Sequence, residues 1–374
     1  MKFEESAAKG LLRDFGIEIP QGQVVATPEA AAAAVRAIGP AMVKAQVPTG
    51  KRGKAGAVRR VESPDQASEA AAAILGMELD GWPVTRLLVE EAVSISREFY
   101  AAVMIDVQQR VPMILFAAEG GMEIEALAAK DADALRRIPL TVGQEVTPQV
   151  LLPQLEGLGL GDQGEAVAQV LVRLYRAWRL MDGELLEVNP LALTQEGRLL
   201  ALDCKLQVDD SAAPRQAHLA ALATPEPMTA LEAEAAAAGL KYIELGGSVG
   251  ILANGAGLTM TSIDAVQHYG GQACNFLEIG GEAYTKAEAA LEILLKHPGL
   301  RSLLVNFCGA FARTDVMATG VAKAWQKLQP SIPVFFSIHG TGEAEAVALV
   351  ERELGITPFA EMDQAVRAAV EAAA

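Results

Sequence analysis

The first half of the chain mixes short apolar runs with longer helical repeats. Apolar side chains recur at helical spacing over residues 4–15 and Gly16 follows, which predicts an amphipathic helix that ends there. A strand is predicted at residues 23–26, and Pro28 then begins an alanine-rich helix that ends near residue 39. Further patterns predict a helix at residues 161–181 and strands at 42–47, 57–61, 86–91, 98–106 and 111–116.

The second half repeats one pattern, a short apolar strand followed by a glycine-bearing loop and a helix. These strands are predicted at residues 249–253, 275–279, 302–307 and 333–338, and a last short strand and helix precede Ala374. Strand–helix units with short connections predict a parallel, doubly wound sheet. Such sheets bind ligands beyond the carboxyl ends of their strands, where the glycine loops fall.

The stretch that joins the two halves, residues 206–238, carries few motifs and three prolines. A chain of 374 residues is long enough for two domains that each bury a core of their own. We therefore predict two domains, residues 1–227 and residues 228–374.

Composition narrows the class of protein. Hydrophobic residues make up 51% and charged residues 21%, and neither a membrane-spanning run nor an apolar signal segment is visible. The three cysteines lack the spacing of a metal site, and with no visible export signal they predict a cytoplasmic enzyme. The formal charge of −16 argues against nucleic acid as a partner, so local clusters must hold any anionic ligand.

One hairpin is the strongest candidate for a metal site. Two apolar runs flank residues 195–197, which predicts a three-residue loop with its glycine in the left-handed conformation. The resulting register places Asn189 opposite Asp203 and Glu187 opposite Lys205, all on one face. A carboxylate and an amide oxygen at this spacing suit Mg²⁺, which completes its coordination with phosphates and water. The alternative is a surface hairpin with an incidental polar pair.

A basic loop is the candidate for an anion site. Residues 48–56 interleave three glycines with three cations, after a short strand that carries Lys44. Glycines allow backbone N–H groups to approach an anion closely, and the cations supply charge. The loop does not match the P-loop pattern, and a solvated basic turn is the alternative. A lysine, such a loop and a later strand that ends in Glu90 resemble the layout of an ATP-grasp site.

Several motifs in fixed order extend this resemblance to the whole chain. They are Val-Lys-Ala-Gln-Val at 43–47, Leu-Val-Glu at 88–90, Arg-Glu-Phe-Tyr at 97–100, Glu-Gly-Gly-Met-Glu-Ile-Glu at 119–125, Glu-Val-Asn-Pro-Leu at 187–191 and Leu-Asp-Cys-Lys at 202–205. Their order and gaps are similar to those of the β subunits of succinate–CoA ligase. The resemblance implies an α/β protein with an ATP-grasp domain followed by a flavodoxin-like domain.

The resemblance also implies roles for individual residues. The nucleotide-binding residues would be Lys44, Arg52, Gly53, Lys54, Glu90 and Glu98. The residues that hold Mg²⁺ would be Asn189 and Asp203. The residues that meet the carboxylic acid would be Asn254, Ala310, Phe311 and Ala312. The cofactors would be Mg²⁺ and ATP or GTP, and the sequence does not choose between the two nucleotides.

The relay histidine of the implied reaction lies on another chain. In the family, phosphate passes from the nucleotide through a phosphohistidine of the α subunit to the acid, and CoA attacks the acyl phosphate. Of the four histidines here, His218, His268 and His297 are expected to be structural, and His339, in a loop after a strand, is a site candidate. The chain is therefore expected to need an α subunit as its partner, in a dimer or a tetramer.

Departures from the family pattern concentrate at the substrate end. Ala310 replaces a glycine, Phe311 a smaller apolar residue and Ser337 an arginine, and residues 246–248 also differ. In the basic loop, residues 48–51 lose a glycine and gain a cation. Two alternatives stay open: the same chemistry on another acid, such as malate or citrate, and a non-catalytic regulatory paralogue.

Overall fold

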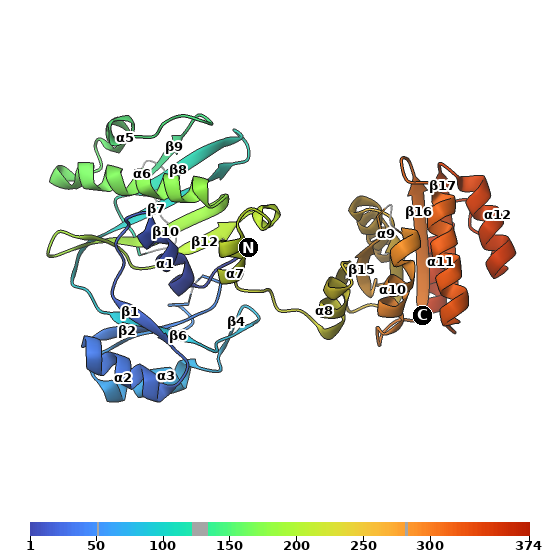
Figure 1. Cartoon of the computed structure of the whole chain (residues 1–374), viewed down its shortest axis with the longest axis horizontal. Coiled ribbons are helices and arrows are strands. Elements are labelled where there is room, and N and C mark those ends of the chain that lie inside the picture. The colour runs from blue at the N-terminus through green and yellow to red at the C-terminus, as the bar shows by residue number, and fades with distance from the viewer. Residues whose placement is uncertain (51, 122–133, 281–282) are drawn as a thin grey trace. The chain divides into compact units, whose positions relative to one another are not determined.

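The computed structural model describes residues 1–50, 52–121, 134–280 and 283–374. The chain divides into two compact units, Met1–Pro227 and Met228–Ala374, and each is described by itself (Figure 1). No helix within the described ranges is long and apolar enough to cross a membrane.

The first unit contains two separate sheets and the helices that cover them. In chain order its elements are α1 (Glu5–Asp14), β1 (Gly22–Val25), α2 (Pro28–Ile38), β2 (Ala41–Ala45), β3 (Val58–Val61), α3 (Pro64–Ile74), β4 (Glu78–Leu79), β5 (Trp82–Pro83), β6 (Leu87–Glu91), β7 (Ile95–Asp106), β8 (Val111–Ala117), β9 (Leu135–Pro139), α5 (Pro148–Leu155), η1 (Gly161–Gln163), α6 (Gly164–Leu180), β10 (Gly183–Thr194), β11 (Leu199–Ala201), β12 (Lys205–Val208), η2 (Asp210–Ala212) and α7 (Ala217–Leu222).

The small sheet has the strand order β1-β6-β2-β3, with every neighbouring pair antiparallel. Helices α2 and α3 lie side by side against it (Figure 1). Both helices begin in the same way, because the hydroxyls of Thr27 and Ser63 accept hydrogen bonds from Ala30 and Gln66 N–H and a proline follows each cap.

The large sheet has the order β11-β10-β7-β8-β9, and β12 pairs with β10. Helix α6 packs on it, and its buried side chains, Leu171 and Leu174 among them, share a core with strand residues such as Phe99 and Val188. Helix α1 lies between the two sheets (Figure 1). Its apolar residues Ala8, Leu11 and Leu12 belong to the core of the large sheet.

The second unit is one five-stranded sheet with helices on both faces. Its elements are α8 (Ala230–Ala237), β13 (Lys241–Glu244), β14 (Val249–Ala253), α9 (Ala256–His268), β15 (Asn275–Glu278), α10 (Ala283–Leu295), β16 (Ser302–Gly309), α11 (Thr314–Leu328), β17 (Val334–Gly340), α12 (Glu343–Leu354) and α13 (Met362–Ala373). The strand order is β13-β15-β14-β16-β17, and only the edge strand β13 is antiparallel.

The four parallel strands, numbered from β14, follow the order 2-1-3-4, which is flavodoxin-like. The predicted parallel, doubly wound sheet is therefore confirmed. The short strand predicted near the C-terminus is wrong, because Phe359 makes only an isolated bridge to Ser337. The order reverses between β14 and β16, so the loops after these two strands form the crevice where such folds bind ligands.

Candidate functional site

The hairpin of β10 with β11 and β12 has the predicted register. Leu191 pairs with Ala201 and Glu187 pairs with Lys205, on either side of the Asn189 and Asp203 positions. The loop between the strands has the predicted conformation, since Gly197 has a φ of 82° and its N–H donates to the Thr194 carbonyl at 3.0 Å. The local sequence therefore sets which oxygen-bearing side chains face each other.

Asn189 and Asp203 line one cavity of about 140 Å³, the second cavity below. The amide oxygen of Asn189 accepts the Gly121 N–H at 2.9 Å. Among the described residues, the hydrogen bonds to Asp203 all reach Oδ1, from Arg52 Nη2 at 2.6 Å and from Cys204 N–H at 2.8 Å. One amide and one carboxylate oxygen are hard donors, so the pair fits Mg²⁺ in its usual setting of few protein ligands.

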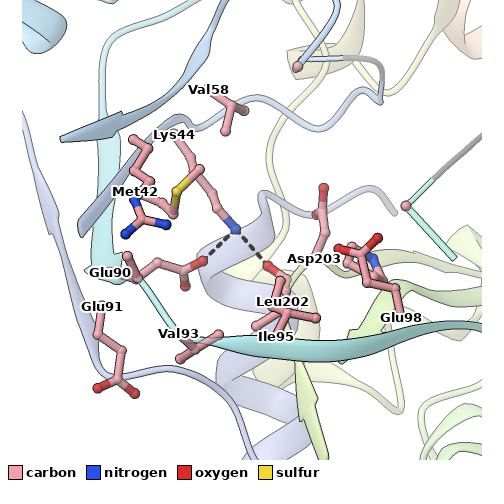
Figure 2. Close-up of a pocket in the computed structure, with 15 residues that line it drawn as sticks. Met42, Lys44, Val58, Glu90, Glu91, Val93, Ile95, Glu98, Leu202 and Asp203 are labelled. Carbon is pink, nitrogen blue, oxygen red and sulfur yellow. Dashed lines mark hydrogen bonds and ion pairs between the residues drawn. The ribbon is translucent and has the colours of Figure 1, made fainter. Parts of the chain in front are cut away.

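A larger cavity of about 420 Å³, the first cavity, lies between the small and large sheets (Figure 2). Its residues come from β2, β6, β7 and the segment after β11, and they include Met42, Lys44, Gly53, Glu90, Glu98 and Asp203. Apolar side chains such as Val58 and Ile95 line the same space. The volume suits an organic ligand, and the mixture of apolar and charged walls suits one with a flat apolar part and a charged part.

Lys44 reaches into the first cavity from β2. Its ammonium contacts Glu90, donates to the Leu202 carbonyl at 2.6 Å and to Glu5 Oε1 at 3.0 Å (Figure 2). Burial lowers the pKa of Lys44, but the carboxylates of Glu5 and Glu90 outweigh burial and hold the pKa above its ordinary value. The amine is therefore charged at neutral pH.

Arg52 is buried beneath the basic loop. Its guanidinium donates to the Ala45 carbonyl at 2.9 Å and to Asp203, and lies 2.8 Å from Glu5 Oε2. Its pKa stands above the usual value because the charges of Glu5 and Asp203 outweigh burial. These contacts direct Arg52 to the carboxylate opposite Asn189.

The rest of the predicted nucleotide set divides between the cavity wall and the surface. Gly53 lines the first cavity and Lys54 is exposed, whereas Lys51 lies outside the described residues. Residues 122–125, the end of the Glu-Gly-Gly-Met-Glu-Ile-Glu motif, also lie outside them. Glu90 is buried against Lys44, and both Glu90 and Glu98 line the first cavity, so the structure brings these predicted residues together.

Sequence patterns missed two residues of this site. Glu5 and Lys9 on α1 are buried against Lys44 and Glu90, although a Glu–Lys pair four residues apart on a helix is typical of a solvated surface. One available signal was position, because both residues border the helical stripe of Ala8 and Leu12. A charged pair beside an apolar stripe marks side chains that reach a neighbouring element.

In the second unit, the loops after β14 and β16 are joined by Asn254. Its side-chain amide donates to the Cys308 carbonyl at 2.9 Å, and its oxygen accepts the Cys308 N–H at 2.8 Å. Among the other predicted acid-binding residues, the Ala310 carbonyl accepts the Thr341 hydroxyl at 3.0 Å, and Ala312 is half-buried. Phe311 is fully exposed.

Two histidines have defined partners. His297 is buried, accepts the Gly299 N–H at Nδ1 and bonds the Leu245 carbonyl through Nε2 at 3.1 Å, so its ring joins two loops. His339 ends β17, and its Nε2 lies 3.2 Å from the Ser337 hydroxyl. These contacts agree with a structural His297 and keep His339 at the edge of the sheet where ligands bind.

Comparison with known proteins decides the family. The chain matches an ATP-grasp domain over residues 2–193 and a CoA-ligase domain over residues 252–371. A succinate–CoA ligase (ADP-forming) β subunit of Chloroflexus aurantiacus is 40% identical over 100% of this chain and 99% of that protein. A GDP-forming β subunit of Thermus thermophilus is 38% identical over 94% of this chain and 93% of that protein. The chain belongs to the succinate–CoA ligase β-subunit family. The predicted family is confirmed.

The arrangement of domains in succinate–CoA ligase β subunits matches the fold described above. A solved structure of ATP citrate lyase from Methanothrix soehngenii aligns with a TM-score of 0.78 over 99% of both chains, at 21% identity. That likeness concerns the fold alone. The predicted order, an ATP-grasp domain followed by a CoA-ligase domain, is confirmed.

Proposed function

We propose that this chain is the nucleotide-binding β subunit of a succinate–CoA ligase. The ligase would form succinyl-CoA reversibly from succinate and CoA, with cleavage of a nucleoside triphosphate to the diphosphate. One observation carries the proposal: the first cavity ends at Lys44 and Asp203, beside the oxygen pair of the hairpin. Apolar walls suit a base, and the charged end suits phosphates.

Phosphoryl transfer requires mainly positioning and charge neutralisation from the protein. Lys44 would contact the phosphates, and the backbone of the glycine loop at Gly53 would approach them closely. Asn189 and Asp203 would hold Mg²⁺, which would neutralise phosphate charge when bound. Glu90 and Glu98 would form the adenine–ribose edge, with Arg52 and Lys54 completing the charge around the loop.

An α subunit would supply the phosphoryl relay and the CoA site. The four histidines of this chain, all within the described ranges, line neither the first nor the second cavity. The second cavity shares Asp203 with the first, so an acceptor from a partner could approach the phosphates from that side. A cytoplasmic location, inferred from cysteine content, stays a prediction.

The acid would bind in the second unit, at the loops joined by Asn254. Ala310, Phe311 and Ala312 would meet the acid there, close to the start of α11, whose free N–H groups favour an anion. The exposed Phe311 and the serine at position 337 are the features that favour testing other acids beside succinate.

The test is CoA-thioester formation by the chain co-purified with its α subunit, across succinate, malate, citrate and related acids, with ATP and with GTP. Turnover of succinate well above the others supports the proposal. Preference for another acid, shifted toward succinate by Phe311→Ile, would assign specificity to that loop. Absence of turnover on every acid, with Mg-nucleotide still bound, would replace the proposal with a regulatory role.

A further inference from the structure

Five charged side chains form a buried cluster beneath the first cavity. They are Glu5, Lys9, Lys44, Arg52 and Glu90, here called the charge cluster. Each of these side chains is at most 8% exposed. Burial of ionised groups is costly unless every charge is paired, so the cluster holds its geometry only as a complete set.

Glu5 is the hub of the cluster. Its Oε1 lies 3.0 Å from Lys44 Nζ and 3.1 Å from Lys9 Nζ, and its Oε2 lies 2.8 Å from Arg52 Nη1. One carboxylate therefore holds a cation of the first cavity and the arginine that holds Asp203.

Lys9 closes the cluster on the opposite side. Its ammonium bridges Glu5 and Glu90 and donates to the Leu202 carbonyl at 3.0 Å. The same carbonyl accepts from Lys44. Lys9 thus competes with Lys44 for no space in the cavity but shares all three of its acceptors.

Helix α1 connects the two sheets through these contacts. Its apolar residues are fixed in the core of the large sheet, whereas Lys44 and Glu90 lie on strands of the small sheet. The hairpin that carries Asp203 belongs to the large sheet. Glu5 and Lys9 therefore set the position of the small-sheet charges relative to Asp203.

We propose that Glu5 and Lys9 are positioning residues of the nucleotide site, which hold Lys44 and Arg52 in place for the phosphates and for Asp203. Glu5 does not line the first cavity, and Lys9 lines neither cavity. Both residues therefore act through Lys44 and Arg52. The inference rests on the proposed nucleotide site, and it adds α1, which no motif of the sequence assigned to that site.

The alternative is that the cluster only stabilises the fold. Removal of Glu5 would leave three cations against one carboxylate, and the repulsion would displace the flexible Lys44 amine before it displaced the backbone. A positioning role predicts that the effect of Glu5 on nucleotide affinity passes through Lys44. A purely structural role predicts equal effects whether or not Lys44 is present. Residues of one network show such coupling in double-mutant cycles, whereas independent sites are additive.

The experiment is a double-mutant cycle on the full chain, with the Kd of Mg-ADP and Mg-GDP measured by calorimetry up to millimolar concentrations. The wild type must bind one of them, and its failure to do so would refute the proposed function itself. We expect Glu5→Gln to weaken binding about tenfold in the wild type and less than about twofold in the Lys44→Gln background. Equal losses in both backgrounds, or no loss in either, overturn the positioning role.

Lys9 provides a second arm if Glu5→Gln does not fold. Lys9→Met is expected to weaken nucleotide binding, and Lys9→Arg to restore most of it, because a cation can again bridge the two carboxylates. Arg13→Met and Asp14→Asn, at exposed positions of the same helix, serve as matched controls and should bind as the wild type does. Equal binding by the Met and Arg variants of Lys9 would contradict the inference.

Discussion

Arg52 and Asp203 lie 151 residues apart and are joined by a hydrogen bond of 2.6 Å from the guanidinium to the carboxylate. The bond links the basic loop of the small sheet to the hairpin of the large sheet. Sequence patterns assigned Arg52 to phosphate and Asp203 to metal as separate tasks. Their contact indicates that the arginine orients the carboxylate, and this difference in role can be measured.

Arg52→Lys should raise the Mg²⁺ requirement of nucleotide binding. Lysine keeps the charge but lacks the planar fork that reaches Ala45, Glu5 and Asp203 together. Partners of metal ligands typically change metal affinity by about tenfold or more, so we expect a shift of that order. The measurement is nucleotide binding as a function of Mg²⁺ concentration, with the exposed Arg59→Lys as control. Weaker binding at every Mg²⁺ concentration, with an unchanged midpoint, would instead place Arg52 on the phosphates.

Glu5 should make the stability of the first unit depend on acid pH. Burial raises the pKa of Glu5, but the charges of Lys44, Lys9 and Arg52 outweigh burial, so the folded pKa lies far below the model value of 4.5. On acidification the unfolded chain takes up this proton first. Glu5 therefore stabilises the fold fully above about pH 4.5, and the stabilisation declines as pH falls toward the folded pKa.

The measurement for Glu5 compares urea unfolding of wild type and Glu5→Gln, followed through Trp178 after Trp82 and Trp325 are replaced by Phe in both. The difference in unfolding free energy should be constant from pH 5 to pH 7 and shrink by about 1.4 kcal/mol per unit below about pH 4.5. A difference that does not change down to pH 3 would contradict a charged, paired Glu5.

Only one of the three thiols should react in the native chain. Cys308 is exposed, whereas Cys204 and Cys274 are buried. Burial raises the pKa of both buried thiols, that of Cys274 to about 12, so neither forms the reactive thiolate near pH 8. A chromogenic disulfide reagent should label one thiol quickly and all three after denaturation, and Cys308→Ser should lose the fast phase. Rapid labelling of a second thiol would disagree with the packing around Cys204 or Cys274.

Asn254→Asp should loosen the ligand crevice of the second unit without affecting the first. Aspartate cannot donate to the Cys308 carbonyl that Asn254 now reaches, and loss of such a bond costs about 1–3 kcal/mol. Urea unfolding followed through Trp325, with the other tryptophans replaced by Phe, measures the loss. Nucleotide binding to the first unit serves as the control. An unchanged second unit would mean that the two loops are held together by other contacts.

Local patterns were sufficient for the elements and for the hairpin register. The turn at Gly197 and the alternation of apolar residues fix which residues face each other, so the cross-strand position of Asn189 and Asp203 follows from a short stretch of chain. The parallel sheet follows in the same way, from repeated strand–loop–helix units with short connections.

Burial of charge could not be predicted from local patterns. Glu5 and Lys9 have the spacing of a solvent-exposed pair, and only the approach of the small sheet to α1 turns them into part of a site. The bond from Arg52 to Asp203 spans both sheets for the same reason. The short β4–β5 hairpin also escaped, because two-residue strands carry no periodicity.

The most direct test of the central claim is transfer of the labelled γ-phosphate of ATP or GTP to the co-purified α subunit. Wild type and the exposed control Asp162→Ala are expected to label the α subunit equally. Asp203→Ala is expected to leave the fold intact, as judged by its unfolding transition, and to abolish the label, because the nucleotide site loses the carboxylate opposite Asn189. Labelling by Asp203→Ala at the wild-type rate would contradict the assignment of this hairpin to phosphoryl transfer.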